Sequence, residues 1–209
     1  MTPLYKNISS LCQAFEREFH LIPALRKEKL LAICDYLSKK ISSKQTAQLI
    51  VICTHNSRRS HIGQIWLATA ADYYQLPAIH TFSGGTEATA FNPRAVKAMQ
   101  SIGFEITTNE ATSDNPKYKI NWRSEMNPYL AFSKKYDAPP NPAEHFGAIM
   151  VCTEADEGCP VVLGSEARWS LPFDDPKAFD GTEQEEEKYR ERAMEIGREM
   201  LYLMSMVEV

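Results

Sequence analysis

Residues 48–60, QLIVICTHNSRRS, join an apolar, β-branched run to a short polar loop and the start of a helix. The run at 49–52 predicts a strand that ends at Cys53, and the residues from Arg59 onward predict a helix. Five residues then connect the strand to the helix N-terminus. A loop of this length can turn its backbone N–H groups toward one point, where the helix dipole adds positive potential. The pattern therefore predicts a cradle for a tetrahedral oxyanion.

Cys53 is expected at the floor of this cradle, where the N–H groups, the helix terminus and Arg59 favour a thiolate. A thiolate that faces a bound oxyanion is a nucleophile. Arg59 offers a planar fork for two oxyanion oxygens, and Ser60 can donate a hydrogen bond to the sulfur. A buried structural cysteine beside a surface arginine is the alternative for so short a pattern. The predicted oxyanion loop comprises Thr54, His55, Asn56, Ser57, Arg58, Arg59 and Ser60.

Composition favours one α/β domain with an extension, because the chain has 209 residues and 44% of them are hydrophobic. A formal net charge of −4 gives no electrostatic case for nucleic acid. The sequence contains neither an apolar run of membrane-span length nor a signal-peptide pattern, so we expect a cytoplasmic protein that does not bind membranes. In a reducing compartment its five cysteines are more often free, catalytic or redox-active than structural. They are Cys12, Cys34, Cys53, Cys152 and Cys159.

Residues 1–46 predict a helical extension that packs on an α/β domain at 47–209. Apolar residues at helical spacing indicate two amphipathic helices separated by Pro23. Cys12 and Cys34 fall on or near apolar faces, and we interpret them as packing residues. The basic side chains of the extension are interpreted as a solvated helix face rather than a partner surface. These are Arg26, Lys27, Lys29, Lys39, Lys40 and Lys44.

Strands and helices alternate along the rest of the chain. A helix is expected at 60–74, a strand at 79–82, and a helix that starts near Pro93 and stops at Gly103. This succession predicts a small parallel sheet flanked by helices. The proline-rich insertion at about 108–144 predicts a hairpin, and the apolar run at 146–152 predicts a buried central strand.

Two cysteines with six residues between them follow the central strand. The spacing of Cys152 and Cys159 fits neither a thioredoxin-type pair nor a zinc site, and no metal site is expected. A redox pair and two unrelated thiols both remain open on spacing alone. If the strand of Cys152 lies beside that of Cys53, both cysteines stand at the carboxyl edge of the sheet, where ligand sites form in open α/β folds.

An acidic loop and a long helix complete the chain. A carboxyl group from Asp174 or Asp175, carried on a loop stiffened by Pro176, could act as a general acid, although such a pair is more often a turn. The sequence TEQE at 182–185 matches a capping box that opens the C-terminal helix. The acidic residues at the start of this helix suit its dipole and predict a solvated face. They are Glu185, Glu186 and Glu187.

Taken together, these motifs resemble the low-molecular-weight protein tyrosine phosphatase family, and within it the branch of thioredoxin-coupled arsenate reductases. The resemblance covers about residues 48–206 and rests on CTHNSRRS, SGGTEATAFNPRAVKAM, CTEADEGCP and WSLPFDDPKAFDGTEQE in that order. It implies a small parallel sheet flanked by helices. It also implies a role for each of five residues: Cys53 as nucleophile, Arg59 as oxyanion ligand, Asp175 as general acid, and Cys152 and Cys159 as resolving thiols.

The resemblance further implies a thiol relay that reduces arsenate to arsenite. Cys53 would attack arsenate, Cys152 would attack Cys53 to release arsenite, and Cys159 would attack Cys152. External thioredoxin would reduce the final disulfide, and no tightly bound cofactor is expected. The segment between the resolving cysteines must rearrange, and the polar run at 153–157 with Gly158 is suited to that change.

Two loop positions differ from the family pattern, with His55 in place of the usual glycine and Arg58 where cysteine is frequent. A residue other than glycine strains the loop if positive φ is required there. The main alternative is a phosphatase that hydrolyses phosphomonoesters, such as a phosphotyrosine protein, through a cysteinyl-phosphate. That reaction needs aromatic side chains to line a pocket for the phenyl ring, and the segment SGGTEATAF offers only Phe91. It also has no use for the thiols of Cys152 and Cys159. A non-catalytic module that binds phosphate without turnover is the third hypothesis.

Overall fold

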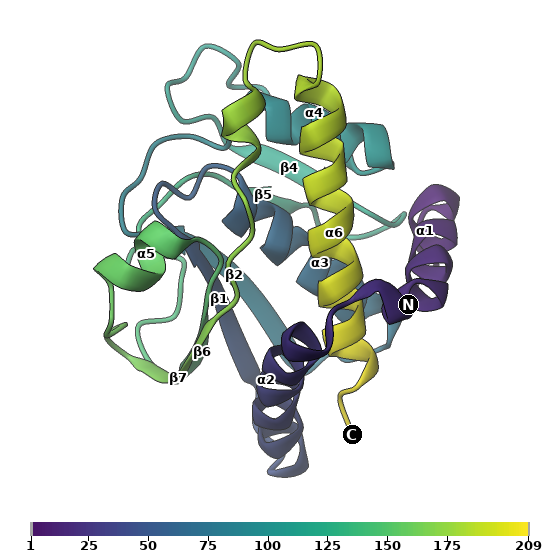
Figure 1. Cartoon of the computed structure of the whole chain (residues 1–209), viewed down its shortest axis with the longest axis vertical. Coiled ribbons are helices and arrows are strands. Elements are labelled where there is room, and N and C mark those ends of the chain that lie inside the picture. The colour runs from purple at the N-terminus through teal and green to yellow at the C-terminus, as the bar shows by residue number, and fades with distance from the viewer. Residues whose placement is uncertain (1, 209) are drawn as a thin grey trace.

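The computed structural model describes residues 2–208 and has a four-stranded parallel sheet at its centre (Figure 1). The strand order is β2-β1-β6-β7. The strands are β1 (Ala47–Cys53), β2 (Ile79–Gly85), β6 (Phe146–Met150) and β7 (Ser165–Ser170). Strands β1 and β6 lie inside the sheet and are buried almost throughout, as an apolar strand covered on both faces must be. The expected parallel sheet flanked by helices is confirmed.

The register of this sheet brings three chain segments to one edge. Cys53 pairs with Gly85 on one side, and Ile52 pairs with Met150 on the other. Because the strands are parallel, their carboxyl ends meet at the same edge. Cys53, the loop after β2 and Cys152 therefore lie together there.

Helices α3 (Arg59–Tyr73), α4 (Pro93–Ile102), α5 (Thr153–Gly158) and α6 (Glu185–Ser205) follow strands or loops of the core. The boundaries of α4 are those expected from the sequence. The Asn92 side chain accepts a hydrogen bond from Arg94 N–H at 2.9 Å, and Gly103 ends the helix with φ of 121°. Helix α6 runs across the front of α3 in Figure 1 and packs against it.

A glycine permits the close contact between α3 and α6. A Cβ atom on Gly197 of α6 would lie 2.6 Å from the Trp66 ring and 2.9 Å from the Phe15 ring. Without it, the two fully buried rings pack edge to face with centroids 5.5 Å apart. This contact also anchors the N-terminal helix that carries Phe15.

The N-terminal helices α1 (Lys6–Arg17) and α2 (Ala24–Ser42), with the short 3-10 helix η1 (Phe19–Leu21) between them, pack against α6. Pro23 precedes α2, and Cys12 and Cys34 are buried as expected. Burial raises the pKa of the Cys12 thiol to about 12. The prediction of a solvated face was wrong for Arg26 and Lys40, because the side chain of each is only 17% exposed. Arg26 pairs with Glu199 of α6, and Lys40 pairs with Glu166 of β7.

The insertion and the short strand before it form a second, antiparallel sheet of three strands in the order β3-β4-β5. Its strands are β3 (Glu105–Thr107), β4 (Tyr118–Asn121) and β5 (Tyr129–Ala131). The hairpin of β4 and β5 was expected, but the short strand β3 was not. After β5 the chain returns to the main sheet, where Gly85 N–H donates to Lys134 O and Tyr136 N–H donates to Gly85 O, both at 2.9 Å.

Two further differences concern the C-terminal part of the chain. Strand β7 was not predicted, because an edge strand with half-exposed residues lacks the apolar pattern of a buried one. The prediction that a capping box at Thr182 opens the C-terminal helix was wrong, since α6 begins three residues later, at Glu185. The Thr182 N–H and hydroxyl both donate to Phe179 O, which closes a turn instead. The Glu185 carboxylate accepts from Gly181 N–H at 2.6 Å.

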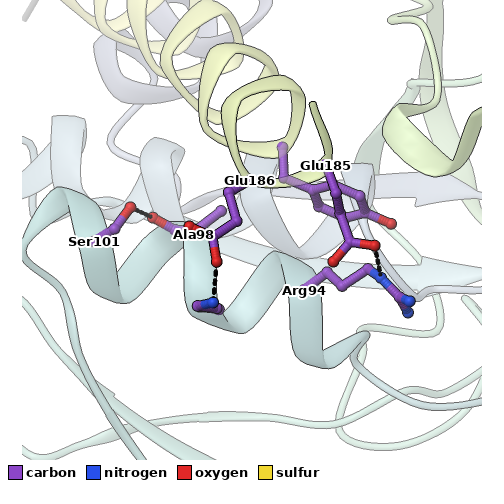
Figure 2. Close-up of a pocket in the computed structure, with 7 residues that line it drawn as sticks. Arg94, Ala98, Ser101, Glu185 and Glu186 are labelled. Atoms are coloured by element: carbon purple, nitrogen blue, oxygen red, sulfur yellow. Dashed lines mark hydrogen bonds and ion pairs between the residues drawn. The ribbon is translucent and has the colours of Figure 1, made fainter. Parts of the chain in front are cut away.

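The acidic start of α6 faces α4 as well as solvent. Figure 2 shows the Glu185 carboxylate directed at Arg94. The two groups lie 2.7 Å apart, and the Glu186 carboxylate pairs with Lys97. A cavity of about 50 Å³ lies between these residues. Its ionic groups pair with each other, so the contact joins α4 to α6.

Two structural findings concern the part of the chain from residue 2 to residue 208. None of its helices has the length and apolar character needed to cross a membrane. No group of three or more His, Cys, Asp or Glu side chains within it is arranged to hold a metal ion.

Candidate functional site

The oxyanion loop lies between the end of β1 and the first residue of α3. Within it Asn56 alone has positive φ, 44°. Asparagine tolerates this left-handed conformation better than most residues. The strain expected at His55 is therefore absent. The His55 side chain is half exposed and lies 3.5 Å from the Glu87 carboxylate.

A chain of hydrogen bonds leads to the sulfur of Cys53. Asn56 Nδ2 donates to Ser60 Oγ at 2.8 Å, and Ser60 Oγ lies 3.1 Å from Cys53 Sγ. Because Ser60 Oγ accepts from Asn56, its own hydrogen is free to point at the sulfur. Lys134 N–H donates to Asn56 Oδ1 at 2.9 Å and fixes the amide orientation. The sequence predicted the hydrogen bond between Ser60 and the Cys53 sulfur. It did not predict that Asn56 orients the Ser60 hydroxyl, because Asn56 is itself held by Lys134, 78 residues away.

The backbone N–H groups of residues 54–59 donate to no acceptor within residues 2–208. The loop carbonyls, by contrast, accept hydrogen bonds from neighbouring segments: Glu87 N–H donates to Thr54 O at 2.8 Å, Ser133 Oγ to His55 O at 2.9 Å, and Asn92 N–H to Ser57 O at 2.8 Å. The loop is thus held by its carbonyls while its N–H groups stay free. Free N–H groups at a helix N-terminus suit an anion.

Gly85, the last residue of β2, lets this loop approach the sheet. A Cβ atom at this position would lie 2.2 Å from Glu87 O and 2.6 Å from Thr54 O. Any side chain would push the loop away from β2. The glycine of the sequence SGGT is required for this close approach.

Arg59 and Asp175 face each other beside the loop. Arg59 Nη2 lies 2.8 Å from Asp175 Oδ2, and Arg59 Nη1 donates to Phe173 O at 2.9 Å. Lys177 N–H donates to the other carboxylate oxygen of Asp175 at 3.0 Å. The Asp174 side chain is 95% exposed and pairs with Arg192 instead. Of the two aspartates, only Asp175 is placed to act with Arg59.

The Arg58 side chain is bound to residues outside the loop. Its Nε donates to the Tyr189 hydroxyl at 2.8 Å, and its Nη2 lies 3.6 Å from Asp180. Asp175 Oδ1 is 3.9 Å from Arg58 Nε. Arg58 therefore ties the end of the loop to α6 and adds positive charge near Asp175.

Cys152 and Cys159 lie at opposite ends of α5, and all five cysteines are free thiols. Cys152 is fully buried, with Sγ 3.4 Å from Thr54 Oγ1. Burial raises the pKa of the Cys152 thiol, although the hydrogen bond with Thr54 lowers it in part. Cys159 is partly exposed, with its Sγ 3.3 Å from Val161 O.

The six-residue helix α5 keeps the two late cysteines apart. Seven residue steps at helical rise correspond to about 10 Å, whereas a disulfide requires Cα atoms within ~7 Å. A bond between them requires α5 to unwind. Arg168 of β7 holds this helix, because its Nη2 donates to Asp156 O at 2.6 Å and its Nε donates to Cys159 O at 3.2 Å. Sequence reasoning missed Arg168 because it lies on the unpredicted strand.

We expect Ser60→Ala to slow alkylation of Cys53 by iodoacetamide about tenfold at neutral pH, because a charge-assisted hydrogen bond to the thiolate contributes roughly 1.5 kcal/mol. Peptide mass spectrometry over a time course measures the rate at Cys53 alone. Ser101→Ala on α4 is the matched control and should leave the rate unchanged. An equal rate in Ser60→Ala and wild type would contradict the proposed hydrogen bond to the sulfur.

The fold is similar to solved structures of two kinds of enzyme. One is an arsenate reductase in a phosphate-binding state, with a TM-score of 0.50, 18% identity, and coverage of 78% of this chain and 99% of that one. The other is a low-molecular-weight phosphotyrosine phosphatase from Vibrio cholerae, with a TM-score of 0.50, 15% identity, and coverage of 76% and 95%. These likenesses support the fold.

Curated relatives extend the likeness to sequence, although no family model matches the chain. An arsenate reductase from Halalkalibacterium halodurans is 28% identical over 134 residues, which is 64% of this chain and 77% of the relative. An arsenate reductase from Bacillus licheniformis is 30% identical over 156 residues, or 74% of this chain and 91% of the relative. Identity at this level, over nearly the full length of the relative, shows that the chain belongs to the arsenate reductase family.

Proposed function

We propose that this protein reduces arsenate to arsenite through a relay of the three thiols Cys53, Cys152 and Cys159. One observation carries the proposal. Cys152 is buried at the same sheet edge as Cys53, against Thr54 of the oxyanion loop, and a short helix separates it from a partly exposed third thiol. A phosphomonoester hydrolase uses only the first of these thiols.

Arsenate would bind to the free N–H groups of residues 54–59 and to the Arg59 guanidinium. Both are suited to a tetrahedral oxyanion, since the loop offers several donors and the guanidinium offers a fork. Asp175, already bonded to Arg59, lies where a protonated carboxyl can donate to an oxygen that leaves arsenic. Ser60 would stabilise the attacking thiolate.

The chemistry runs in three steps. The Cys53 thiolate forms a bond to arsenic, and one oxygen leaves as water after Asp175 supplies a proton. Cys152 then attacks the Cys53 sulfur, and the electron pair of the sulfur–arsenic bond stays on arsenic, which departs as arsenite. Finally Cys159 attacks the Cys152 sulfur, so that Cys53 leaves as a thiolate and a Cys152–Cys159 disulfide remains.

The last step requires α5 to unwind and the disulfide to meet an external reductant. Cys159 is partly exposed, and the apolar side chains of Val161 and Leu163 beside it are 68% and 74% exposed. An external dithiol protein such as thioredoxin can therefore reach this thiol, and we propose it as the electron donor in place of a bound cofactor. The free thiols of the relay require a reducing compartment, and we propose the cytoplasm.

A coupled assay tests the proposal. Reduced protein, arsenate, thioredoxin, thioredoxin reductase and NADPH are combined, and NADPH loss is followed. We expect steady turnover by wild type and at most one arsenite per chain from Cys159→Ser, because this variant cannot form the final disulfide. If arsenate causes no NADPH loss while wild type and Cys159→Ser cleave an aryl phosphate equally, the protein is a phosphatase. If the protein binds phosphate but neither reduces arsenate nor cleaves the aryl phosphate, it is a non-catalytic module.

The structure gives the phosphatase alternative little support. Phe91, which the sequence offered as a wall for a phenyl ring, is fully buried and stacks on His61 with centroids 4.2 Å apart. It is therefore engaged in the core rather than free to receive a substrate ring.

A further inference from the structure

Arg26 of α2 reaches from the N-terminal helices to the loop that carries Asp175. Its Nε lies 2.9 and 2.8 Å from the two carboxylate oxygens of Glu199. Its Nη1 donates to Pro172 O at 2.7 Å, and its guanidinium carbon lies 4.3 Å from the centre of the Phe173 ring. The Arg26 and Glu199 side chains are only 17% and 5% exposed. One side chain thus joins α2, α6 and residues 171–175, the acid loop that carries Asp175.

Arg59 holds the same loop from the opposite side. Its Nη1 bonds to Phe173 O at 2.9 Å and its Nη2 bonds to Asp175 at 2.8 Å. The Phe173 N–H in turn donates to Val151 O at 3.1 Å. Residues 172 and 173 therefore lie between two guanidinium groups, one from the catalytic loop and one from the N-terminal helices.

We propose that Arg26 is a positioning residue for the catalytic step. By fixing the backbone at residues 172–173, it holds the Asp175 carboxyl and the Arg59 fork in the arrangement that the reaction requires. The inference rests on the proposed function and gives the N-terminal helices a role in it. Arg26 itself does not contact the substrate and acts only by positioning the loop.

The contact has features that a simple stabilising link lacks. A buried ion pair contributes little stability compared with apolar residues of the same size. Burial here raises the pKa of Glu199 to about 7, although Arg26 lowers it. The Arg26 guanidinium donates both to the Glu199 carboxylate and to the Pro172 carbonyl. A lysine ammonium group at this position would hold these two partners less rigidly. Arg198 and Glu18 already join α6 to the N-terminal helices at 2.9 Å without touching that loop.

The test compares Arg26→Met/Glu199→Gln with Arg198→Met. The double variant removes the anchor without leaving a buried unpaired charge. Arg198→Met removes a different ion pair, which joins α6 to Glu18 between α1 and η1. We expect the double variant to lower kcat for arsenate about tenfold with KM changed by less than about threefold, because part of the ~10²–10⁴-fold contribution of a general acid is lost. Hydrogen exchange at the Phe173 amide should become about tenfold faster. Arg198→Met should change neither quantity.

Arg26→Lys separates charge from geometry. It keeps a cation near Glu199 but loses the planar fork, so we expect kcat to stay below half of the wild-type value. Wild-type kcat and Phe173 exchange in the double variant, or equal losses in Arg198→Met, would overturn the inference. If wild type forms no arsenite, the proposed function fails, and Phe173 exchange then decides the role of Arg26 by itself: unchanged exchange overturns it, and faster exchange in the double variant alone supports the anchor.

Discussion

Cys53→Ser is expected to reduce arsenite formation to background, a loss of about 10⁴-fold or more. A serine hydroxyl is not ionised near neutral pH, and its oxygen cannot form the disulfide through which Cys152 releases arsenite. The free N–H groups of the loop would remain, because the substitution changes one side-chain atom and leaves the backbone unaltered. Arsenite is measured directly over time, in the presence of thioredoxin and its reductase.

Cys34→Ser is the matched control for this variant. The Cys34 thiol is buried on α2 and donates to Met206 O at 2.8 Å, with Ser38 Oγ 3.9 Å away. A serine hydroxyl can make the same bond to the carbonyl, so we expect activity within about twofold of wild type. Equal activity of Cys53→Ser and Cys34→Ser would contradict the assignment of Cys53 as the nucleophile.

Arg59→Lys is expected to lower kcat/KM for arsenate by about 10²–10³-fold. Arginine reaches Phe173 O and Asp175 with separate nitrogens, so its orientation is fixed from two directions. A lysine ammonium keeps the charge but cannot hold the loop, the acid and an oxyanion in one planar arrangement. Steady-state kinetics at varied arsenate concentration measure the loss.

Arg94→Lys provides the comparison, since Arg94 lies on α4, is 41% exposed and pairs with Glu185 rather than with the loop. We expect its kcat/KM to stay within about twofold of wild type. If Arg59→Lys also remained within threefold, the fork of Arg59 would have no part in binding or in the transition state.

The local patterns of the sequence predicted the loop between β1 and α3 and most of the main sheet. The strand ending at Cys53, the five-residue loop and the helix from Arg59 are all local in sequence, so the apolar β-branched run and the short polar segment after it suffice to place them. The capping box at Thr182 shows the limit of such signals. Its residues also close a turn onto Phe179 O, and the turn prevailed over the helix start.

Side chains that act across long sequence separations could not be predicted in this way. Arg26 and Glu199 are 173 residues apart, and no local pattern marks them as partners. Arg26 looked like one more basic residue on a polar helix face, although its burial and its bond to Pro172 O link the N-terminal helices to the acid loop. The bond from Arg168 to α5 depends on a half-exposed edge strand whose pairing only the fold reveals.

The most direct test of the three-thiol relay is a single turnover without any external reductant. Fully reduced protein is mixed with excess arsenate, arsenite is quantified, and the cysteines are mapped by mass spectrometry of non-reduced peptides. The relay predicts about one arsenite per chain and a disulfide between Cys152 and Cys159, with Cys53, Cys12 and Cys34 still reduced. Absence of arsenite, or arsenite without a Cys152–Cys159 disulfide, would contradict it.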